Sequence, residues 1–222
     1  MIDSGESIDA EGKPVRIEAC STLRNIRVLR EIIKDRNCTE TLEIGLAYGV
    51  SALTILSTLR ENADGEYHHS AIDPYQSRQW KGSSLRVIEE EGFRSNFTFF
   101  EEVSALVLPQ LVERGKQFDL IYIDGSHLFE DVFIDFYYST SLLAVRGILA
   151  FDDCTDPHIR KVVKFVRTNY KKILRKIDLS SYEDPEKSWI EKLGNKMGYR
   201  QMVAFEKIAD PPREWNTRFV PF

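Results

Sequence analysis

Short apolar segments alternate with amphipathic helical segments along most of the chain, and this alternation restricts the fold more than any other feature. The apolar segments lack the polar–apolar alternation of half-exposed strands, which indicates strands buried on both faces. Such strands, separated by helices, are typical of a mostly parallel sheet covered by helices. We therefore predict a doubly wound α/β fold with strands at 41–45, 69–73, 96–100, 118–124 and 147–153, and two later strands within 173–179 and 199–208.

The domain organisation is expected to be simple, because 222 residues suit a single domain. Residues 1–16 are polar and contain two glycines and a proline, so we expect a flexible lead-in there. The domain is expected to span 17–222 and to begin with an amphipathic helix over 17–36. The segment 210–222 is expected to be irregular, and its apolar end, with the first helix, is a candidate homodimer contact.

Charge and composition disfavour several classes of function. The formal net charge of -5 argues against a nucleic-acid partner, because phosphate binding normally requires a basic surface. The sequence has no apolar run of roughly 18 residues and no N-terminal secretory signal, so we expect no membrane partner and a cytoplasmic location. The three widely spaced cysteines are expected to be reduced thiols.

The first chemical signal is the segment LEIGLAYGVS at 42–51, which lies between a predicted strand and a predicted helix. Glycines at such a turn let the backbone approach a ligand, although Gly45 and Gly49 can also serve only to make the turn. The dinucleotide fingerprint GxGxxG places its second glycine against a pyrophosphate, and Ala47 occupies that position here. The loop therefore favours a ligand without phosphates and weighs against a nicotinamide dinucleotide.

The second signal is Asp73, which ends the next predicted strand, 24 residues after Gly49. A carboxylate at this place can accept both hydrogen bonds of a ribose diol. An acid before Pro74 can also simply begin a turn. Taken with the glycine loop, Asp73 predicts a ligand that contains an adenosyl group.

In this order, the two signals resemble the class I S-adenosylmethionine-dependent methyltransferases, over about 41–153. The resemblance implies a Rossmann-like, seven-stranded sheet with helices on both faces, S-adenosylmethionine as the cofactor and a small molecule as the methyl acceptor. The matching cofactor-binding positions are Glu43, Gly45, Gly49 and Ser51 for the methionine part, Asp73 for the ribose, Ser104 for the adenine segment, and Asp124 beside them.

Three acids at the ends of two predicted strands form the third signal. Asp124 ends one strand, and Asp152 and Asp153 end the next. The arrangement resembles metal-dependent O-methyltransferases of small molecules, which implies that these acids hold Mg²⁺ or another divalent cation against an acceptor hydroxyl. Oxygen ligands suit such cations, which lower the pKa of a bound hydroxyl. The alternative is that the aspartates only cap the following helices.

His127, in the segment DGSH, departs from the catechol-type pattern, which has a lysine near this place. A histidine can act as a general base or as a ligand of a transition metal, or it can bond a neighbouring acid at a helix start. We predict that His127 or Asp124 accepts the proton of the acceptor hydroxyl. His68 and His69 are expected at the surface, and Asp135 can face either the cleft or solvent.

Three alternatives to this prediction remain. A metal-independent methyltransferase would use His127 as its sole base and keep its activity under chelation. A nicotinamide-dependent Rossmann oxidoreductase would need space for a pyrophosphate beside Ala47. A non-catalytic module would bind the adenosyl ligand without methylating any acceptor.

Overall fold

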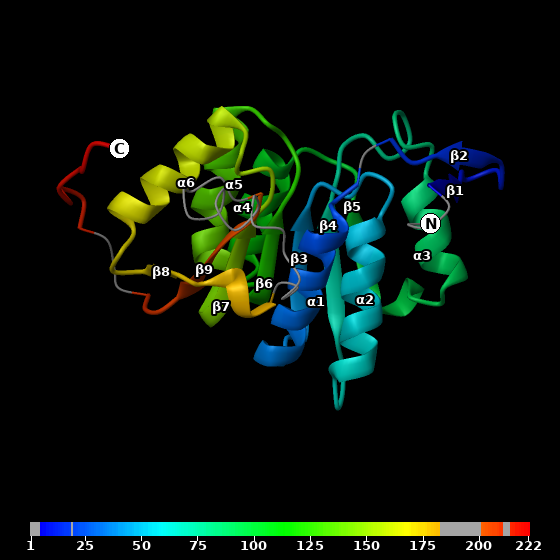
Figure 1. Ribbon diagram of the computed structural model, residues 1–222, viewed down its shortest axis with the longest axis horizontal. Helices are drawn as coiled ribbons and strands as arrows, with labels where there is room; N and C mark the ends of the chain where they lie inside the picture. Colours follow the sequence, from blue (N-terminus) through cyan, green and yellow to red (C-terminus); the bar gives the residue numbers. More distant parts are fainter. Residues whose placement is uncertain (1–4, 19, 183–200, 211–213) are drawn as a thin grey trace.

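The computed structural model describes residues 5–18, 20–182, 201–210 and 214–222. Within these ranges a seven-stranded sheet has the order β5-β4-β3-β6-β7-β9-β8 (Figure 1). The strands β3 to β7 are parallel, and β9 runs antiparallel to β7 and β8. The strands are β3 (Glu40–Ile44), β4 (His68–Ile72), β5 (Phe97–Phe100), β6 (Phe118–Ile123), β7 (Leu143–Phe151), β8 (Leu174–Lys176) and β9 (Val203–Lys207).

Helices cover both faces of the sheet, which confirms the predicted α/β class. Apolar residues of α1 and α2 pack on one face with Leu120 and Tyr122, and α3 adds Ile88 to a cluster on the same side. Residues of α4, α5 and α6 pack on the other face with Ile121 and Phe151. The helices are α1 (Leu23–Arg36), α2 (Val50–Asn62), α3 (Ser83–Glu90), α4 (Ser104–Glu113), α5 (Phe129–Leu142) and α6 (Pro157–Asn169), with 3-10 turns η1 (Arg94–Asn96) and η2 (Leu179–Tyr182).

The strand order places a cleft between β3 and β6. From β3 the chain moves outward through β4 and β5, and it then returns to β6 and continues on the other side. At such a switch point the loops after neighbouring strands diverge and leave room for a ligand at the carboxyl ends of the strands. The predicted functional loops after β3, β4, β6 and β7 all lie at this edge of the sheet.

The N-terminal segment differs from the flexible lead-in expected for residues 1–16. Residues 6–16 form a hairpin of β1 (Glu6–Ile8) and β2 (Pro14–Arg16). The carboxylate of Asp9 accepts hydrogen bonds from two backbone N–H groups of the turn, at 2.9 and 2.8 Å. The hydroxyls of Ser7 and Ser83 lie 2.7 Å apart, so the hairpin is attached to α3. Of the two glycines and the proline, only Gly12 lies in the turn, whereas Gly5 precedes β1 and Pro14 begins β2.

The first helix is shorter than the predicted span of 17–36. It begins at Leu23, because the Thr22 hydroxyl accepts a hydrogen bond from the N–H of Asn25 and caps the helix. The later strand predicted within 199–208 is observed as β9, whereas residues 199 and 200 lie outside the described residues. None of the described helices is long and apolar enough to cross a membrane.

The expectation that His69 lies at the surface is wrong. Its side chain is fully buried on β4, and its Nδ1 lies 2.9 Å from the Thr41 hydroxyl on β3. Burial lowers the pKa of His69 to about 3, so the ring is neutral. The adjacent His68 points to the other face of the strand, where its Nε2 lies 2.8 Å from the hydroxyl of Thr98.

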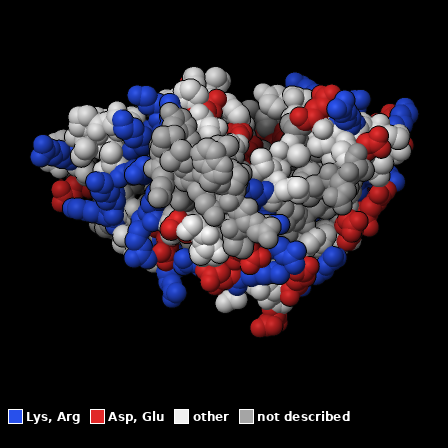
Figure 2. All heavy atoms as spheres, in the orientation of Figure 1, with Lys and Arg blue, Asp and Glu red and all other residues white. Residues whose placement is uncertain are grey.

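The C-terminal segment packs against its own chain. The rings of Phe219 and Phe222 contact the ring of Phe165 on α6, with centroids 6.3 and 5.0 Å apart. Trp215 is 97% exposed. Basic side chains gather near the same helix, and Figure 2 shows many of them at the α6 and β8 end of the molecule.

Candidate active site

The turn between β3 and α2 requires glycine at two positions. Gly45 has a φ of +95°, and a Cβ built on it would lie 2.2 Å from the carbonyl oxygen of Asp124. Gly49 has a φ of +76°, and its Cβ would lie 2.7 Å from the Cβ of Ser84. L residues rarely adopt these conformations. The glycines therefore let the turn lie close to the end of β6 and to α3, and they leave its backbone accessible to a ligand.

Asp73 organises this glycine loop. Its Oδ2 accepts hydrogen bonds from the N–H groups of Leu46 and Ala47 at 3.0 and 2.8 Å. Its Oδ1 accepts one from the N–H of Tyr75 at 2.8 Å. Gln76 donates to the carbonyl of Ala47 at 2.7 Å and ties the same loop to the segment after β4. The acid predicted to bind a ribose thus also anchors the loop that would surround it.

Glu43 lies fully buried beneath the loop, on the sheet face covered by α1 and α2. Neither of its carboxyl oxygens has a hydrogen-bond partner among the described residues, and the nearest ring nitrogen, Nε2 of His69, is 3.5 Å away. Burial raises the pKa of Glu43 to about 8, an effect that the nearby Ser51 hydroxyl opposes. Glu43 is therefore protonated at neutral pH. Unlike Glu43, Ser51 forms part of a cavity wall and can contact a ligand.

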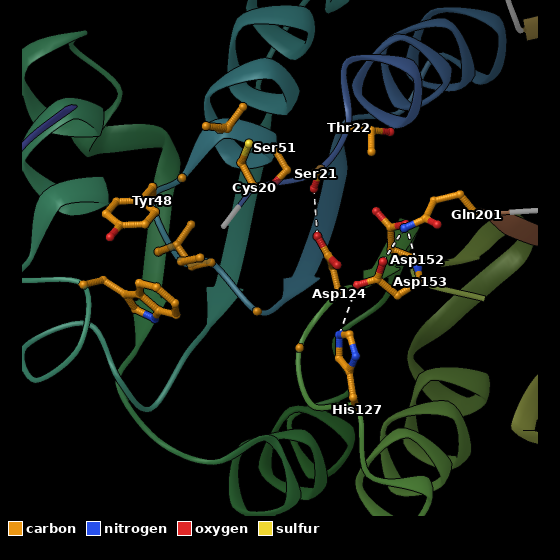
Figure 3. A pocket seen from close by; sticks show the side chains of 17 residues that line it. Cys20, Ser21, Thr22, Tyr48, Ser51, Asp124, His127, Asp152, Asp153 and Gln201 are labelled. Atoms are coloured by element: carbon orange, nitrogen blue, oxygen red, sulfur yellow. Dashed lines mark hydrogen bonds and ion pairs between the residues drawn. The ribbon is translucent and has the colours of Figure 1, made fainter. Parts of the chain in front are cut away.

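Two cavities open at the carboxyl edge of the sheet. The first, which we call the acid-side cavity, has a volume of about 360 Å³ and includes Ser21, Asp124, His127 and Asp152 in its wall (Figure 3). The second, which we call the cofactor-side cavity, has a volume of about 390 Å³. Its wall includes Asp73, Tyr75, Ser104 and Asp135, and both cavities share Gly45, Ala47, Trp80, Asp124 and Gly125.

Asp124 is held by the segment that precedes α1. The hydroxyl of Ser21 donates a hydrogen bond to Asp124 Oδ2 at 2.7 Å and lies 3.1 Å from the hydroxyl of Tyr122. Burial raises the pKa of Asp124 well above its usual range, and repulsion from Asp152 raises it further. Asp124 is therefore a partly buried carboxyl group that retains its proton more strongly than an exposed aspartate.

Asp152 accepts hydrogen bonds from three donors. The Asn25 amide donates to its Oδ1 at 2.6 Å, the N–H of Asp153 donates to the same oxygen at 2.7 Å, and the Tyr122 hydroxyl donates to Oδ2. These bonds lower the pKa of Asp152, but burial outweighs them and leaves it raised. The sequence analysis missed Asn25, Ser21 and Tyr122. Only Tyr122 had a signal, because it lies two residues before Asp124 and shares its side of β6.

Asp153 points toward different partners. Its backbone has a φ of +49°, its Oδ1 accepts a hydrogen bond from Gln201, and its Oδ2 lies 3.0 Å from Nε2 of His127. The other ring nitrogen of His127 lies 3.7 Å from a carboxylate oxygen of Asp156. Within the described ranges, no three or more acidic, histidine or cysteine side chains form a group that could hold a metal ion. Asp153 is thus a partner of His127 in this structure (Figure 3).

Comparison with known proteins shows the family to which this chain belongs. A family described as "Methyltransferase domain" matches residues 42–154. The chain is 28% identical over 151 residues to caffeoyl-CoA O-methyltransferase 1 of Eucalyptus globulus, covering 63% of this chain and 58% of that protein. A caffeoyl-CoA O-methyltransferase of Eucalyptus gunnii is equally similar, with 57% of its length covered. The chain therefore spans less than two thirds of these curated relatives.

Solved structures share the fold at low sequence identity. The O-methyltransferase TomG from Streptomyces achromogenes, in complex with SAM, has a TM-score of 0.63 and 15% identity over 86% of this chain and 82% of that chain. An O-methyltransferase from Bacillus cereus, in complex with SAH, has a TM-score of 0.64 and 13% identity over 86% and 84%. The family match covers the glycine loop, Asp73 and the strand-end aspartates. We conclude that the chain belongs to the methyltransferase domain family.

Proposed function

We propose that this protein transfers a methyl group from S-adenosylmethionine to a hydroxyl group of a small molecule. The observation that carries the proposal is the contact between the two cavities at Gly45 and Asp124. Methyl transfer requires the acceptor oxygen to face the methyl carbon on the side opposite the sulfonium sulfur, so that the three atoms lie in line. The relatives named as O-methyltransferases, and the neighbours solved with SAM or SAH, support the same chemistry.

In this proposal the cofactor-side cavity takes the adenosyl group, with Asp73 at the ribose and Ser104 near the adenine. The methionine part would pass over Gly45 and Gly49 toward Ser51. Glu43 is wholly buried, so we expect it to affect cofactor binding indirectly, through the shape and polarity of the strand end beneath the loop. The acceptor would enter the acid-side cavity between Ser21 and His127.

The proton acceptor that fits best is His127. Its Nε2 lies 3.0 Å from a carboxylate oxygen of Asp153, which can orient the ring and stabilise the imidazolium that forms. Asp124 fits less well, because burial and repulsion from Asp152 raise its pKa and so favour its neutral form, which cannot accept a proton. The alternative with Asp124 as the base requires a change in its surroundings when the ligands bind.

A divalent cation fits this cleft only in part. Asp152 is buried, Asp124 is partly buried, and the two carboxyl groups repel each other; a cation between them would relieve both the desolvation and the repulsion. Asp153, the third predicted ligand, contacts His127 and Gln201. If a cation binds, Asp124 and Asp152 would hold it, and it would lower the pKa of the acceptor hydroxyl. A cation would therefore supplement His127.

The test of the cofactor site compares two aspartates with similar local roles. Asp73 and Asp119 each accept two backbone N–H bonds on one oxygen, but Asp119 lies at the amino end of β6 and bonds Thr39 and Glu40. Calorimetric titration with S-adenosylhomocysteine should show a loss of roughly 10-fold or more in affinity for Asp73→Asn. Asp119→Asn should bind within roughly 2-fold of the unaltered protein.

The outcome separates the remaining alternatives. Equal affinity of both variants would contradict the cofactor assignment, and binding of NAD instead would support the oxidoreductase. Incubation of the unaltered protein with S-adenosylmethionine and a panel of hydroxylated acceptors, with Mg²⁺ or with EDTA, then tests catalysis. Activity that survives EDTA supports His127 without a metal, and activity restored by Mg²⁺ supports the carboxylate pair. Binding without methyl transfer to any acceptor supports a non-catalytic module.

A further inference from the structure

Asp135 is a buried acid that the proposed chemistry does not use. It lies on α5, is 1% exposed and forms part of the wall of the cofactor-side cavity. Its Oδ1 has no hydrogen-bond partner among the described residues. Burial raises the pKa of Asp135 to about 7, which the Ser104 hydroxyl opposes and the charge of Asp131 increases. Burying this carboxyl group therefore costs free energy of folding that the protein nevertheless tolerates.

Unpaired buried polar atoms are rare in proteins and usually have a specific reason. The neighbours of Asp135 along α5, Val132 and Phe136, are buried apolar residues of the core, and an apolar residue at 135 would pack there without any cost of desolvation. None of the described residues is the partner of Oδ1, and a bound ligand can supply one. The cavity beside Asp135 is open to such a partner.

The position of Asp135 in the cavity indicates which part of a ligand it meets. At one end, Asp73 and Gly45 border the cavity where β3 and β4 end. Asp135 on α5 and Ser104 on α4 border it from the sheet face that these two helices cover. Apolar side chains of Ile72, Val103, Leu128 and Ile134 contribute to the wall between them. Apolar walls with a buried acceptor at the end away from Asp73 suit a flat heterocycle that carries an N–H donor on its edge.

We propose that Asp135 is a specificity-determining residue whose Oδ1 accepts a hydrogen bond from the exocyclic amino group of the adenine ring. This inference rests on the proposed adenosyl cofactor. Asp135 would then distinguish a 6-amino purine from a 6-oxo purine, which presents an acceptor oxygen at the same place. An ionised carboxylate facing another acceptor is unfavourable, so at a pH well above 7, where Asp135 is ionised, we expect a preference of roughly 10- to 100-fold for the amino compound.

The experiment compares two probes, S-adenosylhomocysteine and its 6-oxo analogue S-inosylhomocysteine, by calorimetric titration at a pH well above 7, where Asp135 is ionised. The unaltered protein should prefer the adenosyl probe by roughly 10- to 100-fold. Asp135→Asn keeps the size of the side chain and adds an N–H donor that can bond the 6-oxo group. This variant should reduce the preference to roughly 3-fold or less, mainly because it binds the inosyl probe more tightly.

Asp131→Asn is the matched control. Asp131 lies one helical turn earlier on α5 and borders the same cavity, but its Oδ2 already accepts a hydrogen bond from the Ser126 hydroxyl at 2.7 Å. This variant should keep the preference of the unaltered protein. A changed preference in Asp131→Asn with none in Asp135→Asn would overturn the assignment.

The measurement on the unaltered protein decides the matter even if Asp135→Asn does not fold. Equal binding of the two probes would overturn the role of Asp135 and leave the adenosyl cofactor standing. Failure of both probes to bind would overturn the proposed function and this inference together. The two failures are therefore distinguishable.

Discussion

The glycine loop and the strand-end aspartates border the same cleft, but different kinds of contact hold them. On the cofactor side, backbone N–H groups of the loop converge on the carboxylate of Asp73, at most 27 positions away along the chain. On the acid side, Ser21 and Asn25 reach Asp124 and Asp152 across 103 and 127 positions. The loop therefore depends on backbone geometry, whereas the aspartates depend on the identity of distant side chains.

This difference predicts how the two sides tolerate substitution. Where only the backbone of a residue makes the contacts, most other residues can replace it, except at positions that require glycine. A side chain that supplies one of the few donors to a buried carboxylate has no equivalent substitute. We expect substitution of the glycines to disrupt the cofactor side, and substitution of the polar hydrogen-bond partners to disrupt the acid side.

The largest effect is expected at the point where the two sides meet. Gly45→Ala would place a Cβ 2.2 Å from the carbonyl oxygen of Asp124, so β3 and β6 must separate. We expect a loss of more than ~4 kcal/mol in the free energy of unfolding, together with loss of S-adenosylhomocysteine binding. Urea unfolding and calorimetric titration measure the two effects.

Gly92→Ala is the control for Gly45→Ala. Gly92 also has a positive φ, +78°, but a Cβ there would meet nothing within 4 Å. It should lose only about 1–2 kcal/mol, the cost of the left-handed conformation itself. If both variants were destabilised equally, the close approach of the loop to β6 would not be what makes glycine necessary.

The second effect concerns the buried acid beneath the loop. Because burial raises the pKa of Glu43 from 4.5 to about 8, the folded state keeps a proton that the unfolded state has lost above about pH 5. The stability contributed by the protonated group is complete below pH 4.5 and is lost as the pH rises toward 8. Glu43→Gln removes this dependence. Its stability relative to the unaltered protein should rise by about 1.4 kcal/mol per pH unit between pH 5 and about 8.

Chemical unfolding at a series of pH values checks this prediction. Glu40→Gln is the control, because Glu40 begins the same strand but is only partly buried, and burial raises its pKa less. Its stability should follow that of the unaltered protein more closely. Parallel stability curves for Glu43→Gln and the unaltered protein would show that Glu43 is already ionised in the folded state.

The smallest effect is expected on the acid side alone. Asn25→Ala removes the amide that donates to Asp152 at 2.6 Å and leaves a buried carboxyl group with one donor fewer. We expect a loss of about 2 kcal/mol in the free energy of unfolding, because an unsatisfied buried group keeps its cost of desolvation. The affinity for S-adenosylhomocysteine should stay within roughly 2-fold, since the loop contacts are unaffected.

Asn62→Ala provides the comparison, because its buried amide nitrogen has no hydrogen-bond partner among the described residues. Thermal unfolding of this variant should differ little from that of the unaltered protein. A large loss of cofactor affinity in Asn25→Ala would mean that the two sides are coupled and that the contrast between them is too simple.

Much of the fold could be predicted from the sequence because it depends on local patterns. Apolar periodicity identified the five parallel strands to within a few residues, and the order of strands and helices implied the cleft at their carboxyl ends. The prediction failed for His69, which was expected at the surface although it begins the predicted strand 69–73; it lies buried within β4. The prediction also failed for the N-terminal hairpin, whose strands are only three residues long.

The sequence by itself determined the sheet, the glycine turn and the place of Asp73, because each depends on residues close together in the chain. The tertiary structure alone decided which donors reach Asp124 and Asp152, since those contacts span more than a hundred positions. It also decided that Asp153 turns toward His127 and that Asp135 borders the cavity. Periodicity assigns a residue to a face, but the partner it meets there depends on how distant elements pack.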